Sequence, residues 1–342
     1  MYFNPSKILF IMTLVSGTLI SISSTSWIGA WMGLEINLLS FIPLMSDTKN
    51  SSSTEASLKY FLVQALASAT LLFAILMMHL MSDIISYLTK NSMLMIISST
   101  LMLKMGAAPF HFWFPGTMEG LNWINCFILM TWQKIAPIML TSYTIHTSMF
   151  TIMIIISSTI IGSLGGMNQT SMRKLLAYSS INHIGWMLAA MMSGDNLWEI
   201  YFLIYSFLNL TLIIMFHTHN ISHINQPYLM MNHTTMTKFN LFTVMLSLGG
   251  LPPFIGFLPK WLVIESMTKL NFTFTTTIMV IMTLITLFYY LRVALSSFLL
   301  NYTEVNWNQL PSPQLGPHPM LTLMSMFSSL GLIICITLFN IM

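Results

Sequence analysis

Residues 101–116, LMLKMGAAPFHFWFPG, place a lysine, a histidine and two prolines inside a long apolar segment. The residues around Lys104 have the composition of a membrane span. A charge at mid-depth in a bilayer costs about 2.5–3.5 kcal/mol on insertion scales, and more in simulations. Lys104 must therefore face protein or water and not lipid. The stretch predicts a membrane helix that is broken by proline and carries a buried charge.

The composition of the whole chain agrees with this interpretation. Of its 342 residues, 55% are hydrophobic and 6% are charged, where soluble proteins have about 25% charged residues. The mean hydropathy is +0.76. Nothing of domain size is polar enough to fold in water, so we predict a single transmembrane domain over residues 1–342. The formal charge of +3 reflects basic loops and does not indicate nucleic-acid binding.

Apolar segments of about 20 residues, the length that crosses a bilayer, recur along the chain about eleven times. No segment alternates with a period of two, so helices are favoured over barrel strands. The fold class predicted is an all-α polytopic membrane protein with about eleven transmembrane helices. The expected spans are 5–24, 26–46, 56–80, 91–113, 122–145, 149–166, 174–192, 197–217, 238–269, 272–299 and 320–341.

Basic residues at the ends of the spans predict the orientation, because they are retained on the inner side of a membrane. The side that holds the N-terminus has the larger number of basic residues and is therefore predicted to be the inner side. An odd number of spans then places the C-terminus on the opposite side. The N-terminal side carries Lys7, Lys49, Lys59, Arg173, Lys174, Lys238 and Arg292, and the other side carries Lys90 and Lys269.

Three lysines, Lys104, Lys134 and Lys260, lie well inside apolar spans, and Glu35 is the one acid expected at a similar depth. Burial favours the neutral form of a lysine and a nearby carboxylate favours the charged form, so such groups can exchange protons. Groups at one depth on different helices form a lateral line of charge. The alternative is a set of structural salt bridges, but three lysines with one acid leave positive charge uncompensated.

Two proline motifs predict an internal repeat. The sequences GAAPFHFWFP (106–115) and GLPPFIGFLP (250–259) share Gly, Pro-Phe and Pro at the same spacing. They fall in the fourth and ninth predicted spans and so run in opposite directions, which is typical of inverted repeats with broken helices. We expect two inverted five-helix repeats, over about 5–145 and 149–299, and a final helix at 320–341. A simple packing kink is the alternative for each motif.

Histidines offer further candidates. His111 follows the first break, and His183 lies inside the seventh span, where a neutral imidazole can carry a proton between lysines. A hydrogen-bonded core histidine is the alternative interpretation. No metal site is expected, because the remaining histidine group lies in a loop without acidic or cysteine partners. That group is His217, His219, His223 and His233. Nucleotide-binding and iron–sulfur motifs are absent from the sequence.

Five segments together resemble a known family. They surround Glu35, Lys104, Lys134, His183 and Lys260, and read WMGLEINLLSFIPLM, LKMGAAPFHFWFP, TWQKIAPI, RKLLAYSSINHIGWM and LGGLPPFIGFLPKW. Over nearly the whole chain they are similar to the antiporter-like membrane subunits of respiratory complex I, the NADH-ubiquinone oxidoreductase, and among these to the chain 2 group. That family has fourteen helices, and the resemblance implies that this chain begins at the equivalent of the fourth, as in animal chain 2 proteins.

The resemblance implies a role for each residue. Glu35 is the charge partner of Lys104, Lys134 is the connecting lysine, Lys260 is the terminal lysine, and His183 lies between the last two, while His111 is added from its position beside the break. The chain is expected to carry protons while other subunits oxidise NADH and reduce ubiquinone. A free-standing cation/proton antiporter and a structural scaffold are the competing functions.

The resemblance also implies partners and location. No cofactor is expected in this chain, whereas NADH, flavin, iron–sulfur clusters and ubiquinone are expected in partner subunits. The other membrane-arm subunits, accessory subunits and lipids such as cardiolipin are the expected partners, partly to cover the flank left by the missing helices. The implied location is the mitochondrial inner membrane, with the N-terminus in the matrix and the C-terminus in the intermembrane space.

Overall fold

A computed structural model describes residues 5–47, 50–80, 87–145, 147–194, 196–226, 235–299 and 322–332. The chain divides into two compact units, Met1–Ser158 and Thr159–Met342, and each is described by itself. Among the described residues there is no β-strand, and the one isolated β-bridge joins Ser171 to His223. The predicted all-α class is therefore confirmed.

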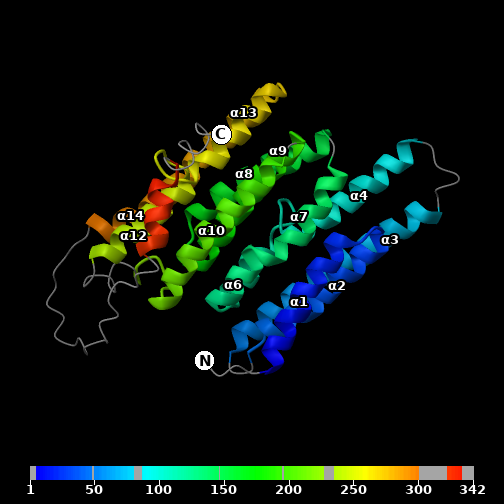
Figure 1. The fold of residues 1–342 in the computed structure, drawn as a ribbon, viewed down its shortest axis with the longest axis horizontal. Helices are drawn as coiled ribbons and strands as arrows, with labels where there is room; N and C mark the ends of the chain where they lie inside the picture. The colour runs from blue at the N-terminus through cyan, green and yellow to red at the C-terminus, as the bar shows by residue number, and fades with distance from the viewer. Residues whose placement is uncertain are drawn as a thin grey trace. The chain divides into compact units, whose positions relative to one another are not determined.

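The first unit contains helices that Figure 1 colours from blue to green. Its first two helices approach each other closely because glycine faces glycine. A Cβ atom added at Gly33 would lie 2.5 Å from the backbone nitrogen of Ser21, and one added at Gly17 would lie 2.9 Å from that of Asn37. Small residues at such contacts are typical of helix pairs in membranes. The helices are α1 (Pro5–Ser23), α2 (Trp27–Met45), α3 (Ser51–Leu80), α4 (Tyr87–Met105), α5 (Trp113–Gly120), α6 (Trp123–Met130) and α7 (Trp132–Thr144).

The second unit is organised around α9. Residues 179–192 of this helix are all buried, because other helices surround it, and its apolar residues accordingly cover its whole circumference. The helices from α8 onward are α8 (Met149–Met167), which begins in the first unit, α9 (Met172–Met192), α10 (Leu197–Thr218), α12 (Thr235–Gly249), α13 (Phe257–Lys269) and α14 (Thr273–Leu299). Residues 322–332 form a further helical segment, and the rest of the predicted final span lies outside the described residues.

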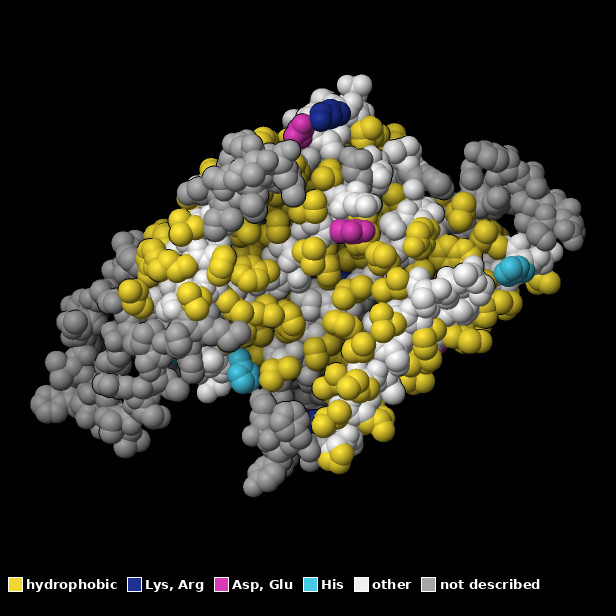
Figure 2. Space-filling model, viewed as in Figure 1, with side chains coloured by type: hydrophobic (Ala, Val, Ile, Leu, Met, Phe, Trp, Pro, Cys, Tyr) yellow, Lys and Arg dark blue, Asp and Glu magenta, His cyan; other side chains and the backbone are white. Residues whose placement is uncertain are grey.

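The outer surface agrees with a membrane environment. Hydrophobic side chains cover most of the visible face in Figure 2, and few charged side chains interrupt them. Within the described ranges, seven helices are long and apolar enough to cross a membrane. They are α1, α2, α3, α6 with α7, α8, α10 and the first part of α14. The count of eleven spans stays a prediction, since broken and more polar helices do not meet this criterion by themselves.

Both proline motifs interrupt a helix, and they do so in the same way. Gly106 has φ +77° and Gly250 has φ +78°, the left-handed conformation that glycine adopts without strain. At each break this glycine donates to a carbonyl three residues earlier and the next residue donates to one five residues earlier, which is the Schellman ending of a helix. The peptide bonds Ala108–Pro109 and Pro252–Pro253 are both cis. The division into two complete inverted repeats stays a prediction.

Candidate functional site

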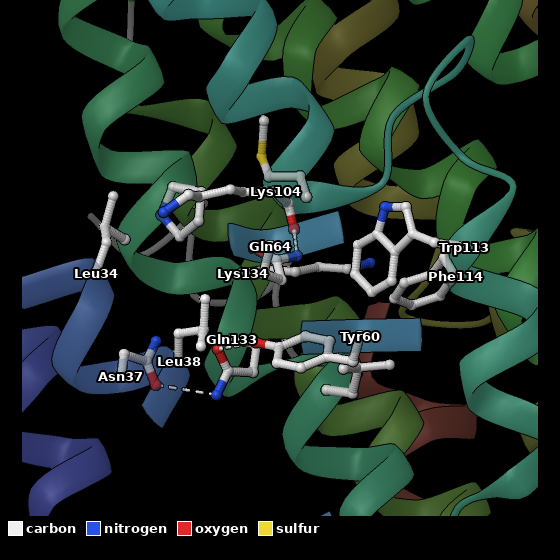
Figure 3. Close-up of a pocket in the computed structure, with 13 residues that line it drawn as sticks. Leu34, Asn37, Leu38, Tyr60, Gln64, Lys104, Trp113, Phe114, Gln133 and Lys134 are labelled. Carbon is white, nitrogen blue, oxygen red and sulfur yellow. Dashed lines mark hydrogen bonds between the residues drawn. The ribbon is translucent and has the colours of Figure 1, made fainter. Parts of the chain in front are cut away.

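A small enclosed cavity in the first unit brings two of the predicted lysines together. Lys104 of α4 and Lys134 of α7 both line it, and its volume is about 20 Å³, which is room for about one water molecule. Figure 3 shows the surrounding side chains, which come from α2, α3, α5 and α7 as well as α4. The other polar residues in its wall are Asn37, Tyr60, Gln64 and Gln133.

Lys104 lies in the last turn of α4, directly before the first break. Its side chain is 7% exposed. Its backbone carbonyl, which the end of the helix leaves without an intrahelical donor, accepts a hydrogen bond from Gln64 Nε2 at 3.3 Å. The carbonyl of Leu103 accepts one from Trp113 Nε1 at 3.1 Å. A cation at this end of a helix is favoured by the helix dipole, so the break itself helps to hold the charge of Lys104.

Lys134 lies just beyond an interruption that the sequence analysis did not predict. The expected span 122–145 is divided at Thr131, whose φ and ψ are −114° and −70°. The hydroxyl of Thr131 donates to the carbonyl of Phe127 at 2.7 Å. The Lys134 side chain is 1% exposed, and its Nζ lies 5.1 Å from the centre of the Phe114 ring, over its face. An aromatic face attracts a cation without supplying an acid.

Glu35 is partly buried, unlike the three lysines. It lies on α2 at the edge between the buried positions Leu34 and Leu38 and the exposed positions Ile36 and Leu39. Its charge acts on Lys104, but no basic group of the described residues lies within 4.0 Å of its carboxylate. Glu35 is therefore partly buried, at the border of the face that α2 turns to the interior, and its place at the depth of the lysines stays a prediction.

A neutral polar network beside the lysines was missed by the sequence analysis. Gln133 Nε2 donates to Asn37 Oδ1 at 2.9 Å, and the Tyr60 hydroxyl donates to Gln133 Oε1 at 3.3 Å. These bonds join α2, α3 and α7, as the dashed line in Figure 3 shows for Asn37 and Gln133. The signal for it in the sequence is that Tyr60 and Gln64 lie four residues apart in an apolar helix, so they share one face.

Lys260 lies in α13 and reaches back to the second break. Its Nζ donates to the carbonyl of Gly249 at 2.7 Å and to that of Leu248 at 3.3 Å. These are the last carbonyls of α12, which the Schellman ending leaves open. The side chain is 6% exposed. The negative end of the α12 dipole thus holds a buried cation that comes from the following helix.

His183 lies on the central helix α9 and is also buried. Its Nδ1 is 2.8 Å from the hydroxyl of Tyr201, and its ring centre is 4.9 Å from that of Tyr205. It lines a cavity of about 10 Å³ together with Leu248, whose carbonyl Lys260 contacts on the other side. His183 and Lys260 therefore belong to one polar region of the second unit.

His111 is not part of the lysine cavity. Its ring is buried in the loop of the first break, where Nδ1 lies 3.2 Å from the carbonyl of Pro109 and the ring centre lies 4.3 Å from that of Phe112. It does not line the cavity that contains Lys104 and Lys134. The geometry is that of a histidine that stabilises the loop, which is the alternative that the sequence analysis left open for histidines.

Lys238 is a fourth buried lysine, although the sequence analysis treated it as a flanking charge. It lies in the first turn of α12 and is 4% exposed. Its position at the edge of an apolar segment gave no sign of burial, because packing against other helices decides the exposure of that turn. Of the loop histidines, His233 lies outside the described residues.

The two units thus hold different sets of groups. The first contains Glu35, Lys104, Lys134 and His111, and the second contains His183, Lys260 and Lys238. Two of these lysines contact an aromatic ring and backbone carbonyls: Lys134 lies over the ring of Phe114, and Lys260 donates to the carbonyls of Leu248 and Gly249. Burial favours the neutral form of a lysine, whereas carbonyl oxygens and aromatic faces favour the charged form, so a lysine in such a site can exist with or without its proton.

Comparisons with known proteins agree on one family. A sequence model described as NADH:quinone oxidoreductase/Mrp antiporter, transmembrane, matches residues 24–286. The chain is 53% identical over 338 residues to NADH-ubiquinone oxidoreductase chain 2 of Aedes aegypti, covering 98% of this chain and 99% of that one. It is 48% identical over 334 residues to the same-named protein of Locusta migratoria, covering 97% of each.

A solved structure shows the same fold. A chain of respiratory complex I from Thermus thermophilus with bound aureothin superposes with a TM-score of 0.83 at 22% identity, covering 96% of this chain and 77% of that chain. A chain of the Mrp complex of a Dietzia species superposes with a TM-score of 0.73 at 17% identity, covering 84% and 60%. From the family match and the insect relatives, the chain belongs to the NADH:quinone oxidoreductase/Mrp antiporter transmembrane family.

Proposed function

We propose that the chain is the antiporter-like membrane subunit of respiratory complex I that corresponds to chain 2, and that it moves protons through its buried lysines. The relatives named NADH-ubiquinone oxidoreductase chain 2 support the assignment to the complex. The proton pathway is proposed to contain Glu35, Lys104 and Lys134 in the first unit and His183 and Lys260 in the second. His111, also predicted as a carrier, lies in the loop of the first break outside the lysine cavity, and its part in the pathway stays a prediction.

One observation carries the proposal: Lys104 and Lys134 share a cavity with room for about one water molecule,. Two ammonium groups that line one buried cavity repel each other, so protonation of one disfavours protonation of the other. Figure 3 shows the two side chains extending in opposite directions, so water in the cavity, together with its polar wall, would pass a proton from one amine to the other. Glu35 acts electrostatically on Lys104 from the edge of α2.

In the second unit, Lys260 and His183 would continue the pathway. The carbonyls of Leu248 and Gly249 stabilise a protonated Lys260, and His183, held by Tyr201, has an imidazole ring that can accept and release a proton. The breaks in the helices would serve this function by presenting free carbonyls at the depth of the lysines.

The redox chemistry is proposed to take place in partner subunits. NADH, flavin, iron–sulfur clusters and ubiquinone belong there, and this chain would respond to the changes that they cause. The proposed location is the mitochondrial inner membrane, with the N-terminus in the matrix and the C-terminus in the intermembrane space. Other membrane-arm subunits, accessory subunits and lipids such as cardiolipin would cover the exposed apolar faces of α1 to α3.

The test is Lys134→Met in the assembled complex. We expect normal assembly and a lower number of protons moved per NADH oxidised, measured in sealed vesicles, because the shared cavity loses one of its two carriers. The control is Lys59→Met, since Lys59 is an exposed lysine that pairs with Glu55. Unchanged pumping in the Lys134 variant at normal assembly would reject the pathway and favour a structural scaffold.

A free-standing cation/proton antiporter is the second candidate, because the fold is shared with a chain of an Mrp complex. Reconstitution of the purified chain alone in vesicles with an imposed pH gradient distinguishes the antiporter from the complex I subunit. Cation-dependent proton flux without any partner would favour the antiporter. Flux that requires the complex and NADH would favour the proposal.

A further inference from the structure

Three tyrosines of the second unit are buried in its interior. Tyr205 of α10 and Tyr289 and Tyr290 of α14 are each no more than 2% exposed. The hydroxyls of Tyr289 and Tyr290 are fully buried, and neither makes a hydrogen bond of ordinary geometry with a residue that the structure describes. Phenylalanine would pack equally well there. Buried polar groups without protein partners in native proteins are commonly satisfied by internal water.

At one end, these tyrosines adjoin the proposed proton carriers. The Tyr205 ring lies 4.9 Å from the His183 ring, and Ser180 is a polar neighbour of the Tyr205 hydroxyl. The Tyr290 ring packs on Gly249, 3.7 Å from the position that a Cβ there would occupy. Since the carbonyl of Gly249 accepts from Lys260, Tyr290 lies directly beside the anchor of that lysine.

The tyrosines also connect with one another. The rings of Tyr289 and Tyr290 meet edge to face with centres 4.7 Å apart. Ser179 of α9 is a polar neighbour of the Tyr290 hydroxyl, and it precedes Ser180, the neighbour of Tyr205. Hydroxyl groups from α9, α10 and α14 thus follow one another through the interior of the second unit.

At the other end, the series reaches an open polar hollow. Tyr289 packs on Gly166, where an added Cβ would lie 2.8 Å from its ring, and Gly166 precedes Asn168 by two residues. Arg292 follows Tyr289 by three residues, which is a rise of about 4.5 Å along α14. Both Asn168 and Arg292 line the hollow, whose volume is about 640 Å³. Its other lining residues are Gln169, Thr170, His223, Ile224 and Asn225.

We propose that Tyr289, Tyr290 and Tyr205, with Ser179, Ser180 and internal water, form a hydroxyl path that conducts protons between this hollow and the pair His183 and Lys260. The inference rests on the proposed function and names the route by which protons reach that site. In each transfer a hydroxyl accepts a proton on its oxygen and releases its own, so one O–H bond forms as another breaks. No tyrosine remains ionised after the proton has passed.

The distribution of basic residues indicates on which side of the membrane the path opens. Arg292 lines the hollow, and Arg173 follows the lining residue Thr170 by three positions. Both belong to the basic residues that the sequence analysis places on the N-terminal, matrix-facing side. The hollow is therefore the proposed opening toward the matrix. Protons would be taken up there and delivered to Lys260 at the second break.

The test uses Tyr290→Phe in the assembled complex, because this change removes one oxygen and keeps the ring. We expect the rate of proton translocation coupled to NADH oxidation to fall about fivefold, the effect of one lost hydrogen bond on a transfer barrier. The matched control is Tyr143→Phe, since Tyr143 is 64% exposed and lies in the other unit; it is expected to pump normally. Assembly is checked first by the mass of the complex in mild detergent.

Lys260→Met, measured alongside, separates this inference from the proposed function. If Lys260→Met impairs pumping and Tyr290→Phe does not, the lysine pathway stands and the tyrosine path is overturned. If neither change has an effect at normal assembly, the proposed function fails as well. A high-resolution map of the assembled complex gives an independent result: water density bridging the Tyr289 and Tyr290 hydroxyls supports the path, and a dry cluster overturns it.

Discussion

The two helix breaks have the same backbone conformation, but different side chains donate to the carbonyls that each break leaves free. At the first, between α4 and α5, the carbonyl of Lys104 has no intrahelical donor and accepts a hydrogen bond from the neutral amide of Gln64. At the second, between α12 and α13, the carbonyls of Leu248 and Gly249 are bound by the ammonium group of Lys260. The buried lysine precedes the first break and follows the second. The repeated motif therefore leaves backbone carbonyls without an intrahelical donor at both breaks. A neutral amide donates to them at the first break and an ammonium group at the second.

Packing differs at the two breaks as well. Gly256, near the start of α13, lies so close to the end of α12 that an added Cβ would be 1.8 Å from the carbonyl oxygen of Ser247. The residue at the matching place in the first motif is Phe112, which is 81% exposed. The second break is thus closed tightly on itself, whereas the first leaves room for the cavity that Lys104 and Lys134 share.

The largest effect is expected from Gly256→Val. The added side chain must separate α13 from the end of α12, which we expect to cost more than about 4 kcal/mol and to prevent the chain from entering the complex. Native gel analysis after mild detergent extraction measures this. The control is Gly116→Ala in α5, where an added Cβ meets no atom within 4 Å. Normal assembly of Gly256→Val would show that the second break is as open as the first.

The two capping groups are expected to differ in strength. Lys260→Met leaves the carbonyls of Leu248 and Gly249 without their charged donor, for an expected loss of about 2 kcal/mol, whereas Gln64→Leu removes one neutral hydrogen bond at about 1 kcal/mol. Thermal unfolding of the extracted complex compares them. Equal losses would mean that the charge of Lys260 contributes nothing to the stability of the second break.

At the first break, Glu35→Gln, Lys104→Met and the double variant form a mutant cycle. We expect both single changes to impair proton pumping and the double change to lose less than their sum, with a coupling of about 1 kcal/mol, because the carboxylate acts on the lysine without a close ion pair. Pumping per NADH is the measurement, after assembly has been confirmed. Additive losses would assign Glu35 to another partner, such as a basic residue of a neighbouring subunit.

The smallest effect is expected from Ser157→Ala. The Ser157 hydroxyl donates to the carbonyl of Ala108 in the loop of the first break at 3.1 Å, and its loss should cost about 0.5–1 kcal/mol without changing the pumping ratio. Limited proteolysis and vesicle assays on one preparation measure both quantities. A reduced pumping ratio at unchanged stability would make this loop part of the pathway.

Many features of the fold were predictable from the sequence, because they depend on local composition. Apolar length and the absence of alternation predict membrane helices, and Gly-x-x-Pro-Phe predicts where α4 and α12 end. The interruption at Thr131 was missed because no glycine marks it. The nearest signal is Pro137, which removes a backbone donor one turn further along,.

The sequence by itself determined which side chains are too costly to expose to lipid, since a charge in an apolar span must find protein or water whatever the arrangement of helices. It identified Lys104, Lys134 and Lys260 on that ground. Only the tertiary structure decided what each meets: the shared cavity, the carbonyls held by Lys260, the partly buried position of Glu35, the burial of Lys238 and the hydroxyls around Tyr290. These depend on how helices distant in sequence rotate and pack, because the direction of a side chain is fixed by contacts that no single segment contains.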